Sequence, residues 1–489
     1  MVLSISIIIV LLFILIGIFF SQEMAIVSGA LYEVLADSMG WFYLFAILAV
    51  LIFVIWIAIS PYGKIRLGKN SDRPDYSNFS WFAMLFCAGM GVGLVFWSVA
   101  EPASHFLDPP PGTVAGTAEA ANVAMQYTFL HWGLHPWAIY TIVGLGLAYA
   151  TFRKDRPCLI SSIFKPCLSE KKFNYIGKGI DVFAIILTAI GVATSLGLGT
   201  LQVNGGLTML FNIPNSIVVQ VIIIVIVTIL FLIDAVTGLE KGIKVLSDFN
   251  IVIAVLMIVY LFIFGPLGTI FKTLFTGMGG YLNHFFSMSL NAAPFEGGDW
   301  SKKWTIFYWA WWISWGPFVG TFIARISKGR TIREFVFGVL LVPTAFSLVW
   351  FAAFGGTLLD MELRQGVAVA GEAIRDINTG LFVVFSHLPG GFIASILAMI
   401  LVLTFFITSA DSATFVISMF SRNGDLNPDN KIKVTWGIFL ALIAVVLLLS
   451  GGLQAIQNIS IIISLPFGFI LLWICWAMLK ELRETETKD

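Results

Sequence analysis

Tryptophan is concentrated in one short stretch of this chain. Residues 309–315 contain four tryptophans, which exceeds what anchoring at a lipid–water interface requires. In a helix, Trp311 and Trp315 share a face because they are four residues apart, whereas Trp312 is turned away from Trp311 by about 100°. The stretch would therefore present indole rings in two directions.

Aromatic faces bind a class of ligand that hydrogen bonds cannot select. A quaternary ammonium group has no N–H donor, yet it is attracted to a ring face by about 2 kcal/mol or more once desolvated. Trp132, Trp137 and Tyr140 in an earlier apolar stretch would extend such a box, and the last two share a helix face. Interfacial anchoring suits Trp436 or Trp473 better. On composition alone, a cation box and plain packing explain the cluster equally well.

Alternate glycines interrupt another apolar stretch. Gly89, Gly91 and Gly93 each weaken a helix by roughly 1 kcal/mol relative to alanine. Their two-residue spacing puts them on different faces, unlike the small residues of close helix packing. Opened backbone at membrane depth is tolerated where it lines a protein cavity. Residues 315–317, Trp-Gly-Pro, predict a second break, and paired breaks are typical of binding sites in inverted-repeat transporters.

Composition identifies the solvent in which these residues must work. Of 489 residues, 58% are hydrophobic and 11% charged, with a mean hydropathy of +0.94, whereas soluble domains carry about 25% charged residues. Most of the chain must therefore face lipid. The net charge is zero and no basic block indicates nucleic acid. The four cysteines have no CxxC spacing, so neither a disulfide framework nor a zinc site is indicated.

Apolar runs predict twelve transmembrane helices. A hydrocarbon layer about 30 Å thick needs about 20 helical residues, and the short alternating segments of a membrane barrel are missing from the sequence. Runs of sufficient length begin near residues 1, 41, 81, 127, 180, 215, 250, 304, 335, 392, 434 and 457.

Loop charge predicts the orientation. Lysine and arginine gather after spans two, four, eight and ten, whereas the expected loops 22–40 and 101–126 contain neither. Basic loops stay in the cytoplasm, so both chain termini are expected there.

Several intramembrane polar residues are weaker candidates. Asp411 is expected to organise its helix and an ion site rather than to move protons, and Glu101 is expected to lie at an interface. His131 and His135 have the spacing of a metal pair but lack a third ligand. No nucleophile–base set appears at membrane depth, so an embedded enzyme is disfavoured, and the short tail disfavours a sensor with an output domain.

The motifs together resemble one family, the betaine/choline/carnitine transporters. The resemblance covers spans three to twelve, and it is carried by GMGVGLVFWSVAEP (89–102), HWGLHPWAIY (131–140), ATSLGLG (193–199), YWAWWISWGPFVGTFIARISKGRTIREF (308–335) and ITSADSAT (407–414). It implies a multi-pass protein of the bacterial plasma membrane and a homotrimer with one pathway per subunit.

The resemblance also implies an all-α integral membrane fold, with two inverted five-helix repeats of the LeuT-like kind. Spans one and two with a cytoplasmic loop would occupy 1–80, and the first repeat, spans three to seven, 81–270. An extracellular connection would occupy 271–303, the second repeat, spans eight to twelve, 304–480, and a short cytoplasmic tail 481–489.

In that family an aromatic box holds the trimethylammonium group of the substrate. The matching positions here are Trp132, Trp137, Tyr140 and Trp312, with Trp311 and Trp315 lining the path. The unwound segment would offer its free backbone N–H groups to the substrate carboxylate at Gly89, Met90, Gly91 and Gly93.

Sodium is the coupling ion that the resemblance implies, with no other cofactor. The first site would use carbonyl and hydroxyl oxygens of Cys87, Met90, Phe405, Thr408 and Ser409. A second site would use Thr188 and Phe318, but Val192 stands where the family has a hydroxyl. Without the family pattern, a Ser/Thr pair in a membrane helix more often bonds its own backbone.

Two further positions bear on selectivity. Ile251 stands where sodium-independent exchangers of the carnitine type carry arginine, so sodium symport is favoured over exchange. Gly93 stands where choline-selective members tend to carry aspartate, which favours a zwitterion such as glycine betaine. Choline, carnitine, ectoine, proline and dimethylsulfoniopropionate stay open as substrates, and proton coupling stays open as an alternative.

Overall fold

The computed structural model describes residues 1–89, 91–237, 240–295 and 299–485, with the side chains of these ranges apart from 86–89, 240–244 and 485. Within these residues helices form the whole fold, and one isolated bridge joins Arg66 to Thr331. The prediction of an all-α membrane protein is confirmed.

Nine helices in the described part of the chain are long and apolar enough to cross a membrane. They are α1 (Val2–Phe19), α2 (Ser21–Ile59), α7 (Glu170–Phe211), α8 (Ile217–Thr237), α9 (Glu240–Phe264), α14 (Ile332–Leu363), α17 (Gly391–Ser421), α18 (Asn430–Leu449) and α19 (Leu453–Thr485).

Three more apolar segments are interrupted. The pair α3 (Asn78–Gly89) and α4 (Val92–Leu107) is divided at the predicted glycines, and the pair α5 (Ala118–Trp132) and α6 (Leu134–Ala148) is divided at Gly133. The third consists of α12 (Asp299–Ser301), the π-helical η4 (Lys302–Ile306) and α13 (Phe307–Arg325). The twelve-span count, the inverted repeats and the homotrimer stay predictions.

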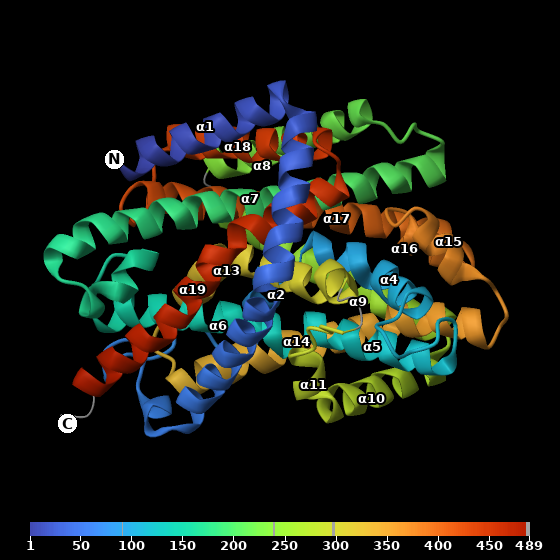
Figure 1. Ribbon diagram of the computed structural model, residues 1–489, viewed down its shortest axis with the longest axis horizontal. Helices are drawn as coiled ribbons and strands as arrows, with labels where there is room; N and C mark the ends of the chain where they lie inside the picture. The colour runs from blue at the N-terminus through green and yellow to red at the C-terminus, as the bar shows by residue number, and fades with distance from the viewer. Residues whose placement is uncertain (90, 238–239, 296–298, 486–489) are drawn as a thin grey trace.

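The remaining elements are short or lie in the connections. They are η1 (Pro61–Lys64), η2 (Tyr149–Arg153), η3 (Ile160–Cys167), α10 (Leu267–Asn283), α11 (Phe285–Ser289), α15 (Val369–Arg375) and α16 (Gly380–Ser386). Figure 1 shows α10 and α11 along one edge of the molecule.

The predicted break at residues 315–317 is wrong. Helix α13 continues through Pro317, although proline removes one backbone hydrogen bond. Neighbouring helices can compensate for such a loss in a membrane bundle. Here α6 packs against this part of α13, where a Cβ built on Gly316 would lie 3.4 Å from Ile139 Cγ2.

The predicted loop at 22–40 is also wrong, because α2 runs unbroken from Ser21 to Ile59. This segment lacks proline, and its Leu, Ala, Met and Glu residues are good helix formers. The break at Gly133 was not predicted either. Gly133 has φ −93° and ψ −131°, and the next amide, Leu134 N, donates to the Tyr281 hydroxyl at 3.4 Å.

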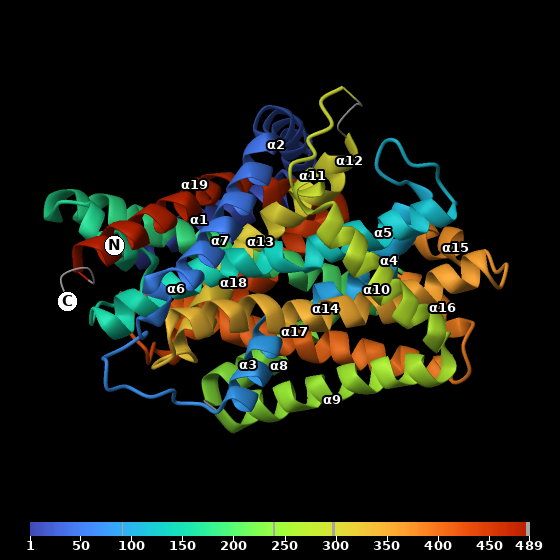
Figure 2. The same ribbon diagram turned by 90° about the horizontal axis from the view of Figure 1, so that it is seen from below.

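Helix α13 lies in the middle of the bundle in both views (Figure 1, Figure 2). It packs against α6, α7 and α19, and every residue from Phe307 to Thr321 is buried. A helix buried on all sides needs no polar face. The tryptophans of α13 therefore point into protein rather than toward a lipid interface.

Cys167 provides a test of the orientation. It is partly exposed at the end of η3, whereas Cys158 and Cys475 are buried. In a Cys87→Ser background, we expect a membrane-impermeant maleimide to label Cys167 in inside-out vesicles and to leave right-side-out vesicles unlabelled, because basic loops stay in the cytoplasm. Cys167→Ser must abolish the signal. Labelling of intact cells at Cys167 would contradict the orientation.

Candidate functional site

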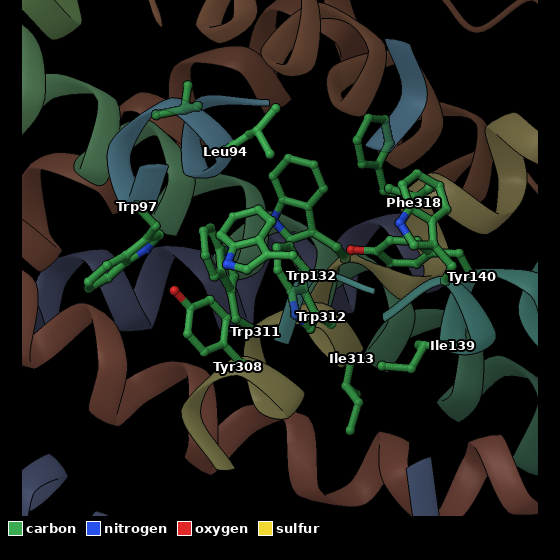
Figure 3. Packing of buried hydrophobic residues seen from close by; sticks show 14 of the residues in the cluster. Leu94, Trp97, Trp132, Ile139, Tyr140, Tyr308, Trp311, Trp312, Ile313 and Phe318 are labelled. Atoms are coloured by element: carbon green, nitrogen blue, oxygen red, sulfur yellow. The ribbon is translucent and has the colours of Figure 1, made fainter. Parts of the chain in front are cut away.

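Four aromatic side chains from α5 and α13 form a buried group, named here the aromatic cluster: Trp132, Tyr308, Trp311 and Trp312. The ring centroids of Trp311 and Trp312 are 4.7 Å apart with the planes nearly parallel, at 13°. Trp132 meets Trp312 edge-on, at 4.9 Å and 77°. All four side chains are at most 4% exposed, and Figure 3 shows their rings close to one another. A desolvated group of ring faces is what cation–π binding requires.

Hydrogen bonds from their indole N–H groups fix the rings of two of these tryptophans. Trp312 Nε1 donates to the His131 carbonyl at 2.9 Å, and Trp132 Nε1 donates to Glu101 Oε2 at 2.7 Å. Trp311 Nε1 is buried and has no hydrogen-bond partner among the described residues. The ring orientations of Trp132 and Trp312 are therefore set by polar contacts as well as by packing.

A second aromatic group lies beside the first. Trp137 and Tyr140 of α6 meet edge-on at 5.5 Å, and Trp315 and Phe318 of α13 do so at 5.7 Å. Trp315 Nε1 donates to the Gly191 carbonyl at 3.0 Å, which ties this group to α7. The Tyr140 hydroxyl is buried and has no partner in the described chain.

The predicted box is therefore divided between two neighbouring groups. Figure 3 shows Tyr140 and Phe318 on one side and Trp132, Trp311 and Trp312 on the other. Both groups come from the same two segments, α5–α6 and α13. Sequence spacing gave the faces of each helix, but not how the two helices are rotated toward each other.

The helix break faces the aromatic residues. Gly91 is extended, with φ −142° and ψ −164°, and α4 starts directly after it. A Cβ built on Gly93 would lie 2.2 Å from Trp311 Cη2, and one on Gly91 would lie 3.3 Å from Trp315 Cη2. Position 93 therefore requires glycine, because a larger residue would collide with the ring of Trp311. Met90 lies outside the described residues, and Gly89 ends α3.

Two side chains bond carbonyls in the first turn of α4. Trp350 Nε1 donates to the Leu94 carbonyl at 3.2 Å, and Gln202 Nε2 donates to the Val95 carbonyl at 3.3 Å. At the same end, the Leu94 N–H donates to the Gly91 carbonyl at 3.1 Å, and the N–H groups of Val92 and Gly93 have no partner within the helix. Such a helix start attracts anions.

One residue predicted for the first sodium site, Ser409, approaches the same break. Ser409 Oγ lies 3.8 Å from the position that a Cβ would take on Gly91. Thr408 Oγ1 donates to the carbonyls of Thr404 and Phe405, at 3.0 and 3.2 Å, which is the backbone bonding common for threonine in helices. The side chain of Cys87 and all of Met90 lie outside the described residues.

The second predicted sodium site is less complete. Thr188 is buried on α7, and its hydroxyl has no hydrogen-bond partner in the described chain. Val192, one turn further along α7, is buried and offers no oxygen. The bond from Trp315 to Gly191 holds this part of α7 against α13, which carries Phe318.

Three residues of this site were missed from the sequence, namely Glu101, His131 and Tyr308. Glu101 is fully buried and accepts hydrogen bonds from Trp132 and Tyr308, so its predicted interface position is wrong. His131 lies with Glu101, whereas His135 contacts Ser289 instead. The available signal was that an acid within an apolar segment is functional by default.

Comparisons with known proteins identify the family to which the chain belongs. A sequence model described as "BCCT, betaine/carnitine/choline family transporter" matches residues 1–487. The chain is 46% identical over 470 residues to "Glycine betaine transporter OpuD" of Bacillus subtilis (strain 168), covering 96% of this chain and 91% of that protein. It is 45% identical over 485 residues to "Ectoine/hydroxyectoine transporter" of Virgibacillus pantothenticus, covering 99% and 96%. The chain therefore belongs to the BCCT family of membrane transporters and is not an enzyme.

Proposed function

We propose that this protein is a secondary active transporter that imports glycine betaine, or a related quaternary-ammonium or zwitterionic compatible solute, by sodium symport. The observation that carries the proposal is the aromatic cluster, whose rings are buried beside the helix break, with Trp311 against Gly93. A cation–π site next to an opened backbone is suited to a ligand with a trimethylammonium group and a carboxylate.

The two ends of a zwitterion would bind to different parts of the site. The cation would be held by the faces of Trp132 and Trp312, and each face is worth about 1 to 2 kcal/mol when water is excluded. The carboxylate would be held by free N–H groups at the start of α4, where the helix dipole adds about 0.3–1 kcal/mol. No arginine is needed to neutralise it.

Substrate choice within this class is the next question. The relatives described above are named for glycine betaine and for ectoine, so both belong in a competition assay. An aspartate at position 93 would repel the carboxylate of a zwitterion. Gly93 has no side-chain charge, so binding of a zwitterion is favoured over binding of choline.

Sodium would act by joining two helices. An ion held by the hydroxyls of Thr408 and Ser409 would connect α17 to the break between α3 and α4, because Ser409 approaches Gly91. Since linkage is reciprocal, sodium should tighten betaine binding by the same factor by which betaine tightens sodium binding. Ile251 offers no fixed positive charge in place of the ion.

The selectivity proposed for Gly93 can be measured with a matched pair of variants. We expect Gly93→Asp to raise the choline-to-betaine uptake ratio at least tenfold over Gly93→Asn, since tenfold is about 1.4 kcal/mol and the new carboxylate repels that of betaine. Any Cβ here meets Trp311, so both variants should transport less than the native protein. Equal ratios in the two variants would refute the role of charge at this position.

Uptake of labelled glycine betaine into proteoliposomes tests the function itself. We expect initial rates that rise with sodium at fixed membrane potential, and competition by ectoine.

The double variant Thr408→Ala with Ser409→Ala should lose sodium-dependent uptake, because both hydroxyl ligands are gone. Val192→Thr should raise the apparent order in sodium, because it restores a hydroxyl at the second site.

Thr404→Ala is the matched control, because Thr404 lies one turn away on α17 and its hydroxyl bonds only the carbonyls of Ile400 and Leu401 among the described contacts. It should keep its sodium dependence. Full uptake by the native protein without sodium would contradict symport and favour exchange or proton coupling. Failure to take up any of these solutes would contradict the substrate class.

A further inference from the structure

Glu101 is the centre of a buried polar network behind the aromatic cluster. Its Oε2 accepts hydrogen bonds from Trp132 Nε1, at 2.7 Å, and from the Tyr308 hydroxyl. Its Oε1 pairs with His131 Nδ1 at 2.7 Å and with His105 Nε2 at 3.2 Å. All of these side chains except that of Trp132 are 0% exposed. Two of the four partners, Trp132 and Tyr308, are walls of the aromatic cluster.

The surroundings of Glu101 fit an ionised carboxylate. A carboxylate accepts about four hydrogen bonds, and four neighbours take these positions. Trp132 can only donate. A carboxylate taken out of water needs this degree of compensation.

The two histidines do not cancel the charge. His105 Nδ1 is buried without a hydrogen-bond partner among the described residues, so a second proton there would leave an N–H without an acceptor. His131 Nε2 lies 3.0 Å from Thr305 Oγ1, a hydroxyl that can donate to a neutral ring. In the described chain, these two histidines contact the Glu101 carboxylate, and no lysine or arginine forms an ion pair with it. With Glu101 ionised and both histidines neutral, the network carries a net negative charge.

A metal ion is a poorer explanation of the same residues. The ligand atoms of Glu101, His105 and His131 lie within 4.8 Å of one another. However, Glu101 already bonds to both histidines directly, and His131 uses its second nitrogen on Thr305. A metal would have to displace these contacts in a site with no exposed atom.

A negative charge at this position strengthens cation binding in two ways. Hydrogen bonds polarise the groups that they join, so an indole that donates to a carboxylate has a more electron-rich ring face. The charge also acts directly through a low-dielectric interior. Neither effect requires an acid in contact with the substrate. An acid in contact would repel the carboxylate of a zwitterion.

We propose that Glu101 is a positioning residue whose negative charge attracts the substrate cation. It does not touch the substrate, and it acts through Trp132 and Tyr308. This rests on the proposed function, because it needs a cationic ligand in the aromatic cluster. Glu101 sets the orientation of the Trp132 ring and makes its face a better cation binder. The site thereby gains attraction for a quaternary ammonium without an acidic residue in the box.

Two probes of the same shape separate charge from structure. Glycine betaine and 3,3-dimethylbutanoate differ in the central atom, a cationic nitrogen or a neutral carbon. Binding to the purified full-length protein is followed by calorimetry and by tryptophan fluorescence. We expect Glu101→Gln to weaken betaine binding at least tenfold and to change the binding of 3,3-dimethylbutanoate by less than twofold. A merely structural residue would weaken both alike.

A double-mutant cycle tests the route through Trp132. In a Trp132→Phe background, which keeps a ring but has no N–H, Glu101→Gln should weaken betaine binding much less than in the native protein. Asp181→Asn is the matched control, because Asp181 is a buried acid that bonds Ser161 and not the aromatic cluster. It should leave the ratio of the two affinities unchanged.

The outcomes distinguish this inference from the proposed function. If the native protein does not bind betaine, the proposed function fails. If it binds betaine and Glu101→Gln weakens both probes equally or neither of them, the counter-charge is refuted. Should Glu101→Gln not fold, Glu101→Asp keeps the charge and must keep the preference for betaine, and loss of that preference would overturn the proposal.

Discussion

A helix that opens inside a membrane must have its freed backbone covered by protein, and this constraint organises the site. Glycine lets the chain extend at position 91 and lets Trp311 reach position 93. Side chains of α14 and α7 also bond the carbonyls of Leu94 and Val95, in the first turn of α4. The rings of Trp311 and Trp315 lie against these glycines, and the Ser409 hydroxyl also approaches Gly91. The break, the ring faces and the candidate ion ligands therefore occupy one place.

The charges of the proposed site follow a simple arrangement. A zwitterion brings no net charge, and its carboxylate faces the positive end of α4. A sodium ion would add one positive charge, and the Glu101 network behind Trp132 carries a negative one. Aromatic faces separate these groups, so that the cation is attracted without an acid beside the substrate carboxylate. Selectivity for a zwitterion and dependence on sodium would then have a common electrostatic origin.

Sequence predicted most of the helices and several of the aromatic residues that the structure brings together, because apolar length, glycine spacing and clustered tryptophan are local signals. Three features depended on distant contacts instead. Pro317 does not break α13, because α6 packs closely against it, and Gly133 breaks span four where Tyr281 contacts the next amide. Glu101 finds its partners 31 and 207 residues away along the chain. Periodicity assigns a residue to a helix face, but it does not say which helix that face meets.

We propose that ring faces of α5 and α13 hold the substrate cation beside the opened helix. A structure of the full-length protein with glycine betaine bound is the decisive measurement. We expect the quaternary nitrogen within about 6 Å of the ring centroids of Trp132 and Trp312, with the carboxylate at the start of α4. Betaine bound elsewhere, with these rings still in contact with one another, would contradict it.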